Sequence, residues 1–185
     1  MTFDEAISAS GINALLPQIT ELSPQGRPLL TQEASDLAIA VAKLEHVSPH
    51  LVCFSHMCEA SFILYSVPQT NGHPESYFLW DVGSFQISMR WSVRSSWLGE
   101  IKTSDLPWVE VFGTVFYESD GVTPAKFNGN PVTNGRLAAR ILKSKGTDDA
   151  TRARLYTGPN HQEKRAALWD SLSPAFVKFF SLYQN

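Results

Sequence analysis

Two carboxylic acids near the middle of the chain, Glu59 and Asp81, have the surroundings that best suit acid–base chemistry. Glu59 stands near the C-terminal end of an apolar run that starts at Ser48 and Pro49, residues typical of a helix start. The apolar positions of the run recur at near-helical spacing: Leu51, Val52, Phe54, Cys58 and Phe62. The negative end of a helix dipole and apolar neighbours both disfavour an ionised carboxylate. We therefore expect a raised pKa for Glu59.

Asp81 follows an extended, aromatic-rich segment, and Phe85 and Ile87 continue the strand pattern beyond Gly83, which suits a bend or bulge. A protonated carboxyl group facing a second, more solvated carboxylate is the arrangement that cleaves glycosidic bonds. The first protonates the leaving oxygen, and the second stabilises oxocarbenium charge, attacks the anomeric carbon or activates water. The structural alternatives are that Glu59 accepts backbone hydrogen bonds and that Asp81 braces a turn.

The order of these residues resembles the lysozyme superfamily. Glu59-Ala60-Ser61-Phe62 is followed by a loop and then by Asp-x-Gly-x-Phe-Gln-Ile-Ser-x-Arg-Trp, from Asp81 to Trp91. The second segment is most similar to chicken-type lysozymes, and parts of both are similar to goose-type lysozymes and the soluble lytic transglycosylase domain. Lysozyme is itself the standard example of a tuned carboxyl pair, so this chemistry and the resemblance are not independent.

The resemblance implies roles for particular residues. Glu59 becomes the catalytic acid, Asp81 the second carboxyl of a hydrolase, and Gln86 and Ile87 the lining of a sugar groove. The segment from Arg154 to Gly158 is similar to the Ala-x-Tyr-Asn-Gly motif of the transglycosylase domain, with Thr157 in place of Asn. It implies that Tyr156 lies near the catalytic acid and hydrogen-bonds it. The expected substrate-binding residues are Ser61, Gln86, Ile87, Trp91 and Tyr156.

Other polar and aromatic residues are weaker candidates for the site. Large aromatic residues more often fill cores than bind sugars, so we expect only one or two of four tryptophans in a groove: Trp80, Trp91, Trp97 and Trp108. His56 lies one turn before Glu59, where a packed, hydrogen-bonded histidine is the usual case. Four arginines are expected to form a basic surface: Arg136, Arg140, Arg152 and Arg154. We expect this surface to be solvated, and contact with peptide-stem carboxylates is the alternative.

Two classes of function fit these residues. The first is a muramidase that cleaves the β-1,4 bond between N-acetylmuramic acid and N-acetylglucosamine in peptidoglycan, or a lytic transglycosylase that forms 1,6-anhydromuramyl products from the same bond. The presence of Asp81 favours hydrolysis. The second is a protein that binds glycan or serves a structural role without cutting. The position of Ser61, one place later than in the family, and the Thr157 substitution motivate this second class.

Composition narrows the range of partners. A formal net charge of −3 gives no reason to expect nucleic acid, and no apolar run is long enough to span a membrane. Cys53 and Cys58 lie five residues apart on one predicted helix, an axial separation of roughly 7.5 Å, longer than the Cα separation that most disulfides allow. We expect free thiols, no metal and no cofactor. The expected partner is peptidoglycan glycan.

The chain of 185 residues predicts one α+β, mainly α domain over residues 1–185 with a lysozyme-like fold. A helical lobe would carry Glu59, and a small β-hairpin or extended segment would lie beside the active-site cleft. We expect a short helix from Thr2 to about Ser8, and residues 1–30 form an N-terminal arm that packs through a set of apolar residues: Leu15, Leu16, Ile19 and Leu22. Thr31 should cap a helix that ends near Glu45 with a buried face: Ala34, Leu37, Ala38, Val41 and Leu44.

The second half of the chain is less regular. Residues 89–98 suit a strand, a turn or a helix, and an apolar run over residues 108–116 favours a buried helix. A long loop over residues 118–134 follows, and Thr133 or Asn134 should cap the next helix. A short helix over residues 148–156 precedes two closing helices, 166–169 and 173–183, with Pro174 in the first turn of the latter.

No secretion signal is visible at the N-terminus, where Asp4 and Glu5 occur and a basic stretch does not. Together with the expected free thiols and the acidic balance, this predicts a monomer made in a cytoplasm. Such a protein would act on the cell wall, in the periplasm or outside the cell, after delivery by a phage lysis pathway, a virion or a secretion machine. A dedicated inhibitor or immunity protein would fit this interpretation, and the sequence carries no mark of one.

Overall fold

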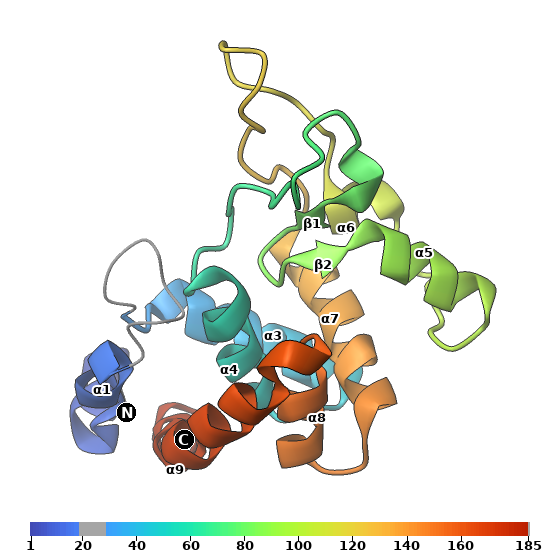
Figure 1. The fold of residues 1–185 in the computed structure, drawn as a ribbon. Coiled ribbons are helices and arrows are strands. Elements are labelled where there is room, and N and C mark those ends of the chain that lie inside the picture. The colour runs from blue at the N-terminus through green and yellow to red at the C-terminus, as the bar shows by residue number, and fades with distance from the viewer. Residues whose placement is uncertain (19–28, 185) are drawn as a thin grey trace.

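Helices dominate the computed structural model, which describes residues 1–18 and 29–184 (Figure 1). The α-helices of this part of the chain are α1 (Phe3–Ser10), α2 (Ile12–Leu15), α3 (Gln32–Glu45), α4 (Pro49–Ala60), α5 (Met89–Trp97), α6 (Trp108–Phe112), α7 (Pro131–Lys145), α8 (Asp149–Leu155) and α9 (Gln162–Tyr183). Short 3₁₀ helices are η1 (Leu16–Gln18), η2 (Tyr77–Leu79) and η3 (Pro159–His161). Two antiparallel strands, β1 (Asp81–Val82) and β2 (Ile87–Ser88), form a small sheet. The predicted mainly helical α+β class is confirmed.

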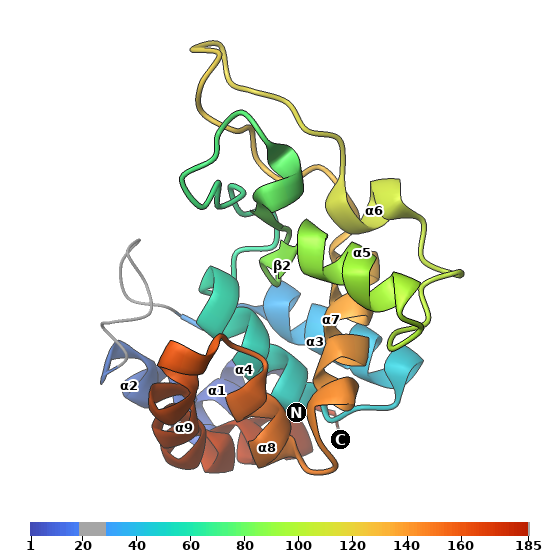
Figure 2. The ribbon, with the colours of Figure 1, turned by 45° about the vertical axis from the view of Figure 1, so that its right-hand side comes forward.

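The elements fall into two parts that meet along α7. Figures 1 and 2 show α1, α4, α8 and α9 at one end of the molecule, and the hairpin, α5, α6 and the long loops at the other. Helix α7 packs on α3 and α8 in the first part and on α6 in the second. The predicted helical hairpin of α3 and α4 is present, and α4 also packs against α9. This arrangement brings the end of α4 close to the strands of the hairpin.

Local capping signals in the first sixty residues predict the helix starts well. Thr2 and Glu5 form a complete capping box, and Gly11 ends α1 in the left-handed conformation. Thr31 caps α3 through the backbone N–H of Ala34. Pro49 takes the first position of α4, and Ser48 precedes it as expected, but its hydroxyl donates to Asp149 at 2.5 Å instead of capping the helix.

The predicted apolar faces are mostly buried. Four of the five α3 positions are 5% exposed or less, whereas Leu44 in the last turn is 53% exposed. In the arm, Leu16 is fully buried and Leu15 packs against the core from a partly buried position. Ile19 and Leu22 lie outside the described residues. Both cysteines are free and buried, as the spacing predicts.

Several boundaries in the second half differ from the prediction. Residues 77–79, expected to be extended, form the 3₁₀ helix η2. Residues 89–98 resolve into the helix α5, and the expected helix over residues 108–116 stops at Phe112 because Gly113 follows with φ 68°. Helix α7 begins earlier than expected. Its cap is Asn130, whose side chain accepts from the N–H groups of Val132 and Thr133.

The two expected closing helices are a single helix, α9, with Pro174 in its interior. Proline removes one backbone hydrogen bond and usually breaks or kinks a helix. Here buried side chains on both sides of Pro174 anchor the helix to the core, among them Trp169, Leu172 and Phe176. The free energy of burying these large apolar groups outweighs the local cost, about 3 kcal/mol for a proline in a helix interior.

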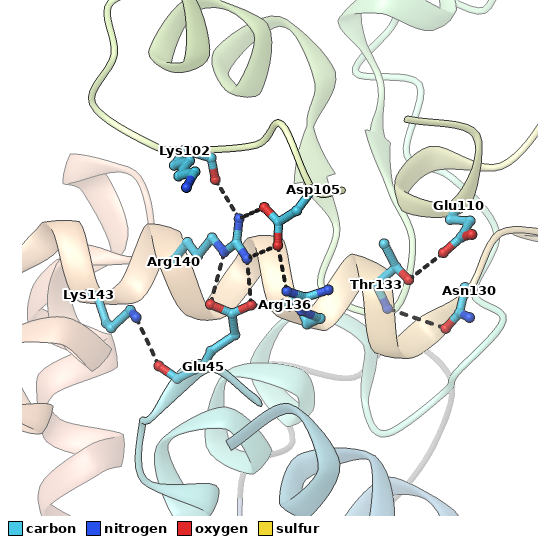
Figure 3. A network of polar contacts seen from close by, with 9 residues as sticks. All are labelled: Glu45, Lys102, Asp105, Glu110, Asn130, Thr133, Arg136, Arg140 and Lys143. Atoms are coloured by element: carbon cyan, nitrogen blue, oxygen red, sulfur yellow. Dashed lines mark hydrogen bonds and ion pairs between the residues drawn. The ribbon is translucent and has the colours of Figure 1, made fainter. Parts of the chain in front are cut away.

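The basic residues expected to form a solvated surface on α7 belong instead to an ion-pair network (Figure 3). Glu45, the last residue of α3, accepts hydrogen bonds from Arg136 at 2.7 Å and from Arg140 at 2.8 and 2.9 Å. Both arginines also bind Asp105 in the loop before α6. Burial alone would raise the pKa of Glu45, but the hydrogen bonds from Arg140 and Arg136 outweigh it and lower that pKa. The network joins three segments that surround the helical core.

Candidate active site

A cleft of about 930 Å³ lies between the two parts of the molecule and contains most of the predicted site. Its walls come from the end of α4, the hairpin, α5, the end of α7, and the segment from α8 into α9. Six of the seven predicted site residues line it: Glu59, Asp81, Gln86, Ile87, Trp91 and Tyr156. Positions from 59 to 156 in the sequence therefore meet around one cavity.

Glu59 is the second-last residue of α4, with a side chain that is 21% exposed. Its Oε1 accepts a hydrogen bond of 2.7 Å from Nη2 of Arg165, an arginine on α9 that is only 6% exposed. Both residues line the cleft. The carboxyl group is thus fixed by one charged partner while part of its surface still faces solvent in the cavity.

The environment of Glu59 raises its pKa, as expected from the sequence. Burial is the largest cause, and the negative charge of Asp81 adds to it. Arg165 opposes the shift through its charge and its hydrogen bond, and His161 opposes it more weakly. Because the net direction is upward, the protonated form of Glu59 persists to higher pH than in an ordinary glutamate.

Asp81 begins β1 and pairs with Ser88 of β2. Its Oδ2 accepts a hydrogen bond of 3.1 Å from the side-chain amide of Asn71, and its backbone forms a bridge to Gln69 in the preceding loop. Burial raises the pKa of Asp81 against the opposing effect of the Asn71 hydrogen bond. The second carboxyl is therefore also partly shielded from solvent.

Gln86 and Ile87 lie at the turn of the hairpin where it faces the cleft. Gln86 has a positive φ of 43°, and its Nε2 donates to the hydroxyl of Ser66 at 2.8 Å and to the carbonyl of Gly83 at 3.0 Å. Its Oε1 is buried and has no hydrogen-bond partner among the described residues. A non-glycine residue in the left-handed region is uncommon, and such strain often marks a functional turn.

Tyr156 lies beside the carboxyl pair, but its hydroxyl group does not bind Glu59 as predicted. It donates instead to the carbonyl of Phe85 at 3.4 Å. Burial, and then the charge of Glu59, raise the pKa of Tyr156. The tyrosine therefore links the segment after α8 to the hairpin, and its raised pKa favours the neutral form that donates this hydrogen bond.

The tryptophans divide between the core, the surface and the cleft. Trp91 lines the cleft, and the Nζ of Lys145 lies 4.9 Å from the centre of its ring. Trp80 is fully buried and donates to the carbonyl of His73, while Trp108 stacks on Phe112. Trp97 is 81% exposed. Only one of the four candidates is thus a cleft residue.

Ser61 is the one predicted site residue outside this cleft. It ends α4 with φ 49° and ψ 39° and stands apart from the described residues that line the cavity. The next residue, Phe62, also has a positive φ, and its ring is buried in the core. Two consecutive residues with left-handed backbone thus end α4 immediately after the pair Glu59 and Ala60.

His56 is a core residue rather than a site residue. It is 1% exposed, packs near Phe85 with ring centres 5.0 Å apart, and pairs through Nε2 with the carbonyl of Ile63 at 3.3 Å. Its Nδ1 has no partner within the described chain. Burial lowers the pKa of His56 to about 4.

Replacing His56 with Leu should remove part of the acid sensitivity of the fold. An unfolded chain binds a proton at this histidine near pH 6.5, whereas the folded protein does so only near pH 4. The contribution of His56 to the free energy of unfolding is therefore fully present above pH 6.5. It decreases by up to about 3 kcal/mol as the pH falls toward 4. Urea unfolding at pH 7, 5.5 and 4 should show a steeper decline for the native chain than for the variant. Parallel declines would contradict the prediction.

Two important residues carried no signal that identified them in the sequence. Arg165 lies 106 positions after its partner Glu59 and follows Lys164 in an ordinary polar start of a helix. Asn134, expected as a helix cap, is instead fully buried inside α7. Its Oδ1 accepts from the N–H of Phe85, and its Nδ2 donates to the carbonyls of Val82 and Val111. One side chain thus holds the hairpin and the end of α6 against α7.

Gly83 allows this close approach between the hairpin and α7. It has φ 87°, and a Cβ atom at this position would lie 2.2 Å from Nδ2 of Asn134. Replacing Gly83 with Ala should therefore destabilise the protein by more than the roughly 1–2 kcal/mol cost of the left-handed backbone alone. Gly72 also has a positive φ, but open space surrounds it, so Gly72→Ala is the matched control. Equal thermal midpoints for the two variants would refute the packing argument.

Within the described ranges, no cluster of three or more His, Cys, Asp or Glu side chains could hold a metal ion. None of the described helices has the length and apolarity needed to cross a bilayer. No protein-family model, curated protein or solved structure matches the chain.

Proposed function

We propose that the chain is a lysozyme-like enzyme that cleaves the β-1,4 bond between N-acetylmuramic acid and N-acetylglucosamine in peptidoglycan. One observation carries the proposal: a carboxyl group with a raised pKa, Glu59, lies in a large cleft within electrostatic reach of a second carboxyl group, Asp81. Paired carboxyl groups with shifted pKa values are the chemical requirement of glycoside cleavage. The mainly helical fold with a small hairpin at the cleft is compatible with the lysozyme-like architecture.

Glu59 would act first as the general acid. Its proton passes to the glycosidic oxygen as the bond breaks, and positive charge develops at the anomeric carbon. Asp81, on the hairpin that lines the same cleft, would stabilise that charge or direct the incoming water. Glu59, now ionised and held by Arg165, would then accept a proton as the second step completes. Gln86, Ile87 and Trp91 would form the sugar-binding walls.

Two products are compatible with this mechanism. Water as the acceptor gives a reducing muramic acid end, and the muramyl 6-hydroxyl gives a 1,6-anhydro end. The shielded carboxyl of Asp81 within reach of Glu59 favours hydrolysis. Mass spectrometry of digested wall fragments distinguishes the two, because hydrolysis adds the mass of one water. Anhydromuramyl ends as the sole product would assign the chain to the transglycosylases.

A non-catalytic glycan-binding role is the second candidate. The short ion pair with Arg165 supports it, because this contact opposes protonation of Glu59. Incubating the native protein with purified sacculi decides between the two. Release of soluble fragments supports the enzyme, and retention on intact sacculi without release supports the binding protein. In both cases we propose a monomer made in a cytoplasm and delivered to the wall.

A further inference from the structure

The charges around the cleft have the opposite balance to the chain as a whole. The full sequence has 15 basic and 18 acidic residues. The cleft lining has three cationic side chains, Lys145, Lys164 and Arg165, and two acidic ones, Glu59 and Asp81. A cavity that gathers cations on an acidic protein favours an anionic ligand.

All three cations of the cleft lining come from helices α7 and α9, and the cleft surface that they form is called the wall below. Lys145 is the last residue of α7, and Lys164 and Arg165 lie in the first turns of α9. The 22-residue helix α9 also begins at this wall, so the positive end of its dipole adds to the same potential. Asp81, by contrast, belongs to the hairpin. The positive charge of the cleft therefore comes from helices α7 and α9, where Glu59 neutralises Arg165 when it is ionised.

Two contacts show how these charges are held. Lys145 keeps its Nζ over the ring of Trp91, at the cleft rather than in bulk solvent. The Arg165 guanidinium donates a hydrogen bond from Nη2 to Glu59. Its Nη1 is buried and has no hydrogen-bond partner among the described residues. Whenever Glu59 carries the proton that a general acid needs, the charge of Arg165 is no longer neutralised. The positive potential of the cleft is thus highest in the state that would react.

We propose that the wall of Lys145, Lys164 and Arg165 binds carboxylates that project from the glycan strand. This inference rests on the proposed function and specifies its substrate class: acidic muramyl strands rather than a neutral polymer such as chitin. The carboxylates belong either to the peptide stems or to the lactyl groups that are exposed when the stems are removed. Both offer the same chemistry to the wall.

Binding to the Glu59→Gln protein tests the proposal without turnover. This variant keeps an oxygen for Arg165 and mimics the neutral form of the acid. Calorimetry would compare three oligosaccharides of equal length: a muramyl tetrasaccharide with stems, the same tetrasaccharide after amidase treatment, and an N-acetylglucosamine tetramer. We expect the first to bind roughly tenfold more tightly than the neutral tetramer at low salt, with the advantage shrinking as salt rises above about 0.1 M.

Adding Lys145→Met to the Glu59→Gln protein should weaken its binding of the stem-bearing tetrasaccharide by roughly three- to tenfold. Lys143→Met is the matched control, because Lys143 lies on the same helix but donates to the carbonyl of Glu45, away from the cleft. Tight binding of both acidic glycans identifies the lactyl carboxylate as sufficient, and tight binding of the first alone identifies the stem. Equal binding of all three overturns this inference but leaves the proposed function intact. If none of the three oligosaccharides binds, both this inference and the proposed function are overturned.

Discussion

Replacing Glu59 with Gln should reduce wall lysis by at least 10²–10⁴-fold, the usual contribution of a general acid. The amide cannot supply the proton that the leaving oxygen needs, and it cannot later accept one. The Gln oxygen can still accept the hydrogen bond from Arg165, which holds Oε1 of Glu59 at 2.7 Å in the native protein. The variant should therefore stay folded. Turbidity of a sacculus suspension measures the rate, and circular dichroism with a thermal melt checks the fold.

Glu163→Gln is the matched control for that experiment. This substitution removes one negative charge, as Glu59→Gln does. Glu163 lies in the first turn of α9 on the exposed surface, outside the described lining of the cleft. It should lyse sacculi at nearly the native rate. A folded Glu59→Gln protein with native activity would eliminate Glu59 as the acid and, with it, the mechanism.

Replacing Arg165 with Gln should change the pH profile of the proposed wall lysis as well as its rate. Arg165 lowers the pKa of Glu59 through its charge and its hydrogen bond, so its removal lets that pKa rise further. The protonated acid then persists to higher pH, and the alkaline limb of activity moves upward. The rate itself should fall about 10²-fold, because the carboxyl loses the partner that orients it.

Arg165→Lys separates the two effects. The lysine keeps the positive charge but loses the planar fork of donors, so the alkaline limb should return toward its native position while the rate recovers only in part. If both Arg165 variants unfolded at lower temperature but kept the native pH profile, Arg165 would have a purely structural role. Initial rates on sacculi from pH 4 to 9, paired with unfolding midpoints, provide both readouts.

The local signals of the sequence placed each of the two carboxyl residues on its element, whereas their meeting around one cleft was expected from the family resemblance. Glu59 could be placed near the end of a buried helix because Pro49 and the apolar spacing define α4. Asp81 and Gln86 could be placed around a bend because Gly83 interrupts a strand pattern. Each of these inferences depends on residues within about ten positions of the one concerned.

The features that the sequence did not reveal depend on contacts between distant segments. The partnership of Glu59 with Arg165 requires α4 and α9 to pack side by side, and no local rule marks which arginine will be buried. The continuity of α9 through Pro174 is likewise decided by its packing on the core. Ser61 lies outside the described lining of the cleft, at the first of two consecutive residues with positive φ that follow α4.

The triple hydrogen bond of Asn134 has a consequence for the order in which the chain assembles. Strands of two residues each are too short to persist on their own. The Asn134 amide supplies hydrogen-bonding partners to Phe85, Val82 and Val111, and it can do so only once α7 exists. During refolding, the catalytic aspartate proposed here would therefore reach its place late, after the helices have consolidated. An incompletely folded molecule would therefore contain Glu59 on its helix before Asp81 is fixed beside the cleft.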